Sequence, residues 1–116
     1  MSEVSSTLFQ EQGEYSLSSG ELSIKVIAAN AHHTTFSIRL NGRLIKNGSG
    51  DVNVISLVTA GEELYIKANI HKPSGGSIHA GLTVKLKDAG EEKVLEYTHP
   101  AADYEIVEYK VKIALV

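Results

Sequence analysis

His71 and His79 are the residues of this chain whose types and spacing could do chemistry together. Each stands on the polar side of a segment in which apolar and polar residues alternate. If these segments pair as antiparallel neighbours with Leu64 opposite Leu86, the two imidazoles face each other, with Cβ atoms about 4.5–5.5 Å apart. Adjacent imidazoles make half of a zinc site, or a pH switch in which two protonated rings repel.

A metal site needs more than this pair, because a catalytic zinc ion takes at least three protein ligands. A third ligand would come from His99, Asp103 or the His32-His33 dipeptide, and the spacing favours none of them. We therefore interpret His71 and His79 as solvent-exposed histidines on a wet face, and we expect neither a metal nor a cofactor.

The same polar side also predicts a platform for a glycan. Tyr65 offers an aromatic ring, its polar neighbours offer hydrogen bonds, and Gly81 leaves room for a sugar to approach. Ligand sites combine apolar surface with a few convergent polar groups. The candidate ligand-binding residues are Tyr65, Lys67, Asn69, His71, His79 and Thr83.

Other motifs point to no enzymatic activity. Residues 47–53 hold oxygen ligands suited to calcium, but they do not match an EF-hand loop, and Asn, Gly, Ser and Asp are also the residues of turns. The Lys72–Ser77 segment contains glycines without a following helix that could bind phosphate. No nucleophile elbow occurs, and carboxylates such as Glu91 and Glu92 lack the apolar shielding that raises a pKa.

Two alternating segments must position the platform. In Glu63–His71 every second residue is apolar, which is typical of an antiparallel strand with one buried and one wet face. The segment Ile78–Lys87 alternates in the same way. A one-residue slip would turn one apolar side to water, so the register is well specified if the two strands pair.

The dipeptide Asn41-Gly42 lies between two further alternating runs and predicts a tight hairpin. A type I′ turn needs positive φ at both central positions, which asparagine and glycine tolerate. A two-residue loop also determines the register, with Leu40 facing Arg43 and Ile38 facing Ile45.

Eight segments predict strands, spaced near ten residues apart with turn signals between them and no helix. They are 21–28, 34–40, 43–46, 51–58, 63–71, 78–87, 92–97 and 104–116. The predicted fold is all-β, an antiparallel β-sandwich of about eight strands with Greek-key or jelly-roll-like connections. A small closed β-barrel is the alternative.

The segments also predict their own places in the fold. Asp51–Val58 is apolar on both faces, which indicates a central strand covered on both sides. The long final segment, 104–116, suits a central or sheet-spanning position. Residues 1–20 are rich in Ser, Glu and Gln and predict a loosely ordered arm that adds at most a short edge strand, tethered by Phe9 or Leu17. The single sandwich domain then spans 21–116.

Composition and charge limit the classes of partner that we expect for this chain. The chain has 116 residues and a net charge of −3, and its eleven basic residues form no cluster in the sequence, so we expect no nucleic-acid partner. It contains no cysteine, which excludes disulfides and thiolate chemistry. The acidic, polar N-terminus is unlike a signal peptide and no apolar run is long enough to span a bilayer. We expect no membrane partner, and a cytoplasmic protein or one exported without a signal peptide.

These observations favour a non-catalytic binding or interaction module whose ligand is a glycan or a protein surface. The first alternative is a structural or assembly subunit, a homo-oligomer that associates through sheet edges or through the Val107–Leu115 face. The second alternative is a small metal-dependent enzyme that uses His71 and His79.

Overall fold

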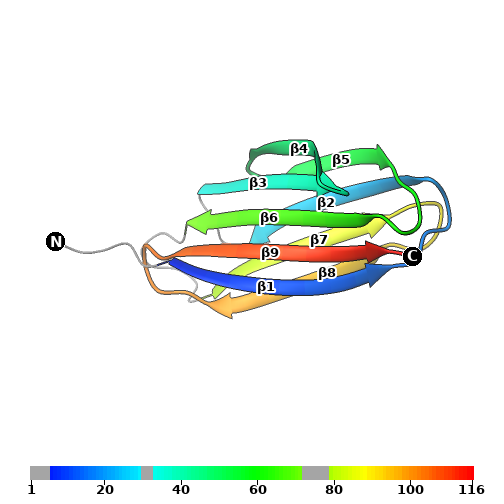
Figure 1. Cartoon of the computed structure of the whole chain (residues 1–116). Coiled ribbons are helices and arrows are strands. Elements are labelled where there is room, and N and C mark those ends of the chain that lie inside the picture. The colour runs from blue at the N-terminus through cyan, green and yellow to red at the C-terminus, as the bar shows by residue number, and fades with distance from the viewer. Residues whose placement is uncertain (1–5, 30–32, 72–78) are drawn as a thin grey trace.

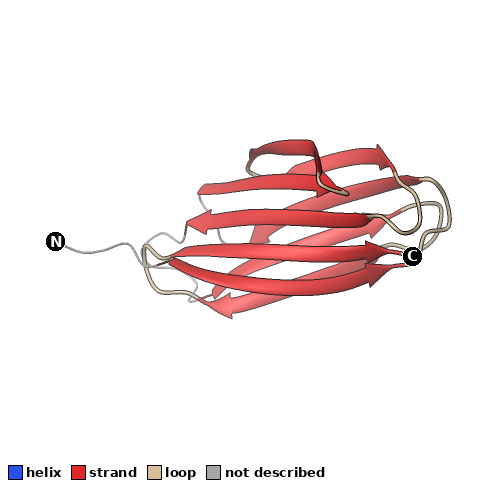
Figure 2. Cartoon of the chain, viewed as in Figure 1, coloured by secondary structure: helices blue, strands red, loops and turns tan. Residues whose placement is uncertain are grey.

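A computed structural model describes residues 6–29, 33–71 and 79–116, and these form nine strands and no helix (Figure 1). The strands are β1 (Ser6–Tyr15), β2 (Glu21–Ala29), β3 (His33–Leu40), β4 (Arg43–Ser49), β5 (Val52–Leu57), β6 (Glu63–His71), β7 (His79–Lys87), β8 (Lys93–Pro100) and β9 (Ile106–Leu115). Figure 2 shows strands joined by short loops throughout this part of the chain. The all-β prediction is confirmed, with nine strands where the sequence predicts about eight.

The strands form two sheets that pack face to face and do not close into a barrel (Figure 1). The five-stranded sheet has the order β1-β9-β6-β3-β4, and the four-stranded sheet has the order β5-β2-β7-β8. All neighbours are antiparallel except β1 and β9, which run parallel. The predicted β-sandwich is therefore confirmed. The described residues include no helix long and apolar enough to cross a membrane.

The core lies between the sheets and is made by strict alternation along the strands. Inward side chains of β6 and β9 are at most 1% exposed; they are Leu64, Ile66, Ala68, Ile70, Val107, Tyr109, Val111, Ile113 and Leu115. Fully burying such an aliphatic side chain stabilises the fold by about 1.5–3 kcal/mol. β9 lies between β1 and β6, which confirms its predicted central position. Its Val107–Leu115 face is buried in the core and is not available for assembly.

Consecutive strands seldom pair, because the chain crosses between the sheets at six of its eight connections. β6 and β7 lie in different sheets, so the predicted pairing of Glu63–His71 with Ile78–Lys87 is wrong. The physical reason is that both edges of β6 are already occupied by β3 and β9. Leu64 faces Leu40 and Ile113 in place of Leu86.

The β3–β4 hairpin has the predicted turn and only half of the predicted register. Asn41 has φ 50° and Gly42 has φ 88°, as a type I′ turn requires. Leu40 faces Arg43 as predicted. A β-bulge between Ile38 and Arg39 then shifts the pairing, so that Ile38 faces Lys46 and its predicted pairing with Ile45 is wrong. β4 continues to Ser49, three residues beyond the end of the predicted strand 43–46.

β5 is an edge strand and not the covered central strand that its composition predicts. It pairs only with β2. Val52 is buried, whereas Ile55 is 63% exposed and Leu57 is 76% exposed on the outward face. The apolar residues on the outward face of β5 are therefore exposed and not covered by another part of the described chain.

β1 is a full strand of ten residues at the edge of the five-stranded sheet, longer than the short strand that the sequence predicts for the arm. Both predicted tethers, Phe9 and Leu17, pack against the core. The Phe9 ring stacks on the His99 ring of β8, with centroids 3.6 Å apart and an interplanar angle of 6°. This contact joins the edge strands of the two sheets.

Asp88 ties the β7–β8 turn to the β1–β2 loop. Its carboxylate accepts hydrogen bonds from the backbone N–H groups of Ser18, Ser19 and Gly90, and from the Tyr15 hydroxyl at 2.9 Å. The backbone donors, Gly90 foremost, hold the pKa of Asp88 well below its ordinary value. The charged form is thus the form that the folded chain stabilises.

We expect Phe9→Ala to lower the free energy of unfolding by about 1–3 kcal/mol, less than for a fully buried phenylalanine. Loss of the stacking contact should also speed amide exchange over residues 6–15. Leu8→Ala is the control, because Leu8 is the neighbouring residue, faces outward and is 45% exposed. Denaturant unfolding and amide exchange measure both effects, and equal behaviour of the two variants would contradict the tethering role of Phe9.

Asp88→Asn should lower the urea midpoint at neutral pH, because it removes the charge that the backbone donors stabilise. A depressed folded pKa contributes stability above the unfolded value of about 3.9, and that contribution disappears as the pH falls further. The gap between the variant and the wild type should therefore narrow as the pH drops below about 4. Asp51→Asn, at an exposed turn position, controls for the loss of one negative charge. A gap that is constant with pH would refute this role of Asp88.

Candidate functional site

The outward side chains of the five-stranded sheet form rows that cross it, because directly paired residues share a face. We call the two adjacent rows at its middle the central rows. The first contains Leu44, Arg39, Tyr65, Lys112 and Gln12, and the second contains Asn47, Ser37, Lys67, Lys110 and Gln10. All five strands of the sheet contribute to this surface.

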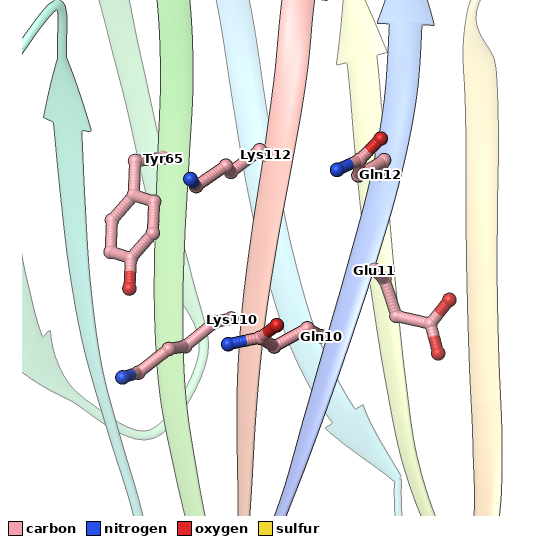
Figure 3. A pocket seen from close by; sticks show the side chains of 6 residues that line it. All are labelled: Gln10, Glu11, Gln12, Tyr65, Lys110 and Lys112. Atoms are coloured by element: carbon pink, nitrogen blue, oxygen red, sulfur yellow. The ribbon is translucent and has the colours of Figure 1, made fainter.

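An open hollow of about 430 Å³ lies on the central rows (Figure 3). Figure 3 shows the Tyr65 ring from β6 beside the ammonium groups of β9, with the glutamine amides of β1 beyond them. The side chains that face this hollow are Tyr65, Lys110, Lys112, Gln10 and Gln12. Glu11 borders it as well, but its carboxylate points away, toward His99 at 3.2 Å.

The central rows carry four positive charges and no negative one. Lys67 and Lys110 are directly opposed, and Arg39 and Lys112 stand on either side of Tyr65. Like charges in directly opposed positions destabilise a sheet. Backbone geometry thus holds several cations beside one aromatic ring.

A carboxylate in the row beside Lys67 and Lys110 partly neutralises the positive charge of the central rows. The Lys67 ammonium lies 3.2 Å from a carboxylate oxygen of Glu108. The Lys67 side chain is 41% exposed, so this ion pair contributes little to stability. Arg39 reaches the carbonyl oxygen of Gly42 in the hairpin turn at 3.4 Å.

The six ligand-binding residues predicted from the sequence fall on two opposite faces of the sandwich. Tyr65, Lys67, Asn69 and His71 lie on the outward face of β6, in the five-stranded sheet. Thr83 and His79 lie on the outward face of β7, in the four-stranded sheet. The platform predicted from both strands together is therefore divided.

The two histidines do not meet. His71 is opposite His33 and Ile106, whereas His79 is opposite Pro100. They lie on different sheets, so the predicted juxtaposition is wrong. Within residues 6–29, 33–71 and 79–116, no group of three or more His, Asp or Glu side chains is placed to hold a metal. His32 and the Lys72–Ser77 segment lie outside the described residues.

An aromatic cluster fills the space between β1 and β8, under the edge of the sandwich. It contains Phe9, His99, Tyr97 and Tyr109. The Tyr109 hydroxyl donates to the Ala80 carbonyl at 2.7 Å, and burial raises its pKa to about 12. Burial also raises the pKa of Tyr97. Both phenols stay protonated at neutral pH and serve packing.

Sequence reasoning missed the residues of β1 and β9 that complete the central rows. Lys110 and Lys112 alternate with buried residues, so their outward orientation is readable from the sequence. Their position beside Tyr65 depends on the pairing of β6 with β9, which no local pattern indicates. Gln10 and Gln12 need the parallel pairing of the chain's two terminal strands as well.

No protein-family model matches the chain, and no curated protein or solved structure matches it either. The candidate site therefore rests on its own geometry.

Proposed function

We propose that this protein is a non-catalytic binding module that holds a glycan on the central rows of the five-stranded sheet. The observation that carries the proposal is the Tyr65 ring beside an open hollow whose other walls are amides and ammonium groups. A ring supplies apolar surface for a sugar, and convergent polar side chains supply hydrogen bonds that orient it. Glutamine amides both donate and accept, which suits hydroxyl groups.

A rigid support favours binding at this position. Tyr65 stands on β6, which is hydrogen-bonded on both sides, and its neighbours Leu64 and Ile66 are fully buried. Little conformational entropy is lost when a ligand meets a preorganised surface.

The chemistry of the rows favours binding over hydrolysis. Most glycosidases need two carboxyl groups on either side of the scissile bond. The central rows hold none, and Glu108 in the next row is engaged with Lys67.

Tyr65→Ala should weaken glycan binding about tenfold, because it removes the ring against which the sugar packs. Tyr65→Phe keeps the ring and should bind nearly as well as the wild type. Tyr104→Ala is the control, since Tyr104 is a 68% exposed tyrosine away from the central rows. A glycan array identifies the ligand and calorimetry measures the affinities. The proposal would be overturned if the protein binds no glycan on the array, or if Tyr65→Ala binds the glycan as tightly as the wild type does.

A second candidate function is self-assembly through β5, and one observation favours it. Of the four edge strands in the described sheets, β5 alone contains no charged residue. β1, β4 and β8 carry the charges, bulge or proline that block unwanted pairing at a sheet edge, and β5 has none of these. Its outward Ile55 and Leu57 are also the most exposed large aliphatic side chains among the described residues.

If β5 joins two copies, the mass measured by sedimentation should rise with protein concentration. Ile55→Lys should keep the chain monomeric, because it places a charge at the centre of the pairing edge. Val94→Lys is the matched control, with a 44% exposed residue on the same outward face but on the β8 edge. A wild-type protein that stays monomeric at every concentration would exclude this candidate.

A further inference from the structure

We infer that the glycan held on the central rows is anionic, a polymer whose sugars carry carboxylate or sulfate groups; this inference rests on the proposed function. The chain as a whole has a net charge of −3, yet the ten positions of the central rows sum to +4. Four of the eleven basic residues are gathered there. Charge of this sign beside a sugar-binding ring is complementary to an acidic sugar and not to a neutral one.

The arrangement of the cations supports a bound anion. Lys67 and Lys110 face each other directly across neighbouring strands, and Lys112 stands next along β9. Such like-charge neighbours weaken the sheet unless an anion lies between them. Glu108 supplies one counter-charge, at 3.2 Å from Lys67. The row on the other side of the central rows holds Glu63 and Glu14, so the excess of positive charge is confined to the two central rows.

Their spacing fits a chain with repeated charges better than a single small anion. Paired residues on neighbouring strands are about 4.8 Å apart, and residues two apart on one strand are about 6.7 Å apart. The ammonium groups and the Arg39 guanidinium therefore form a two-dimensional array around Tyr65. A polymer with an acidic group on successive units can meet several of them at once, which multiplies weak individual contacts.

The other face of the sandwich carries opposed lysines without the ring and the amides. Lys25 and Lys85 also face each other, on the outward side of the four-stranded sheet. Their row continues to Asn53 and Val94, so no tyrosine ring and no glutamine amides accompany them. This second pair has the same charge and the same strand geometry, and it provides a matched control.

The test measures binding of a short oligouronate and of its methyl ester by calorimetry at neutral pH. The ester keeps the sugar backbone and loses the charge. We expect the acidic form to bind at least about tenfold more tightly, and its affinity to fall as salt is added. A sulfated oligosaccharide of similar length tests the alternative acidic group, and preference for either one supports the inference.

Lysine variants then test which positive charges on the protein contact the acidic sugar. Lys67→Gln combined with Lys110→Gln and Lys112→Gln should weaken binding of the acidic sugar by a factor at least about ten times larger than the factor by which it weakens binding of the ester. Lys25→Gln combined with Lys85→Gln should bind like the wild type. Circular dichroism confirms that each variant is folded, and single lysine variants replace the triple variant if it is not.

The outcomes separate the two proposals. Equal affinity for the acidic sugar and its ester, abolished by Tyr65→Ala, would overturn the inference and leave the proposed function standing. Failure to bind any sugar would overturn both. Equal affinity for poly-glutamate would show that the surface recognises charge without sugar, and would also overturn the inference.

Discussion

The structure depends on one constraint, which is that each inner strand of the five-stranded sheet must bury one of its two faces. β6 and β9 lie side by side in that sheet, and their inward side chains are at most 1% exposed. Side chains alternate along a strand, so the residues between these buried ones must face outward. The candidate site is the consequence, because the core determines which residues stand on the wet face and at what spacing.

Features encoded by neighbouring residues could be predicted from the sequence. The alternation over Glu63–His71 locates β6 to the residue, and the positive φ values needed at Asn41 and Gly42 locate the hairpin turn. The fold class follows from many such local signals together. Burial of one face explains why: the pattern is periodic, and it is readable without knowledge of any partner strand.

Features encoded by distant pairing were not predictable in this way. β6 pairs with β3 and β9, and its sequence neighbour β7 belongs to the other sheet. No local property distinguishes a connection that turns back from one that crosses the sandwich. β5 shows the same limit, because apolar residues on both faces are expected of a central strand and here belong to an edge. Two of the six residues of the predicted platform, His79 and Thr83, therefore lie on the far face.

The site also depends on the two ends of the chain. Its glutamine amides come from β1 and its lysine ammonium groups from β9, and the parallel pairing of these strands brings residues about a hundred positions apart into one row. β1 is an edge strand that pairs with β9 and packs inward through Phe9. A ligand that touches both Tyr65 and Gln10 would cross β9 and clamp β1 to the sheet. Binding and the order of the N-terminal strand are then thermodynamically linked, because a ligand that favours the fully paired sheet shifts the equilibrium toward it.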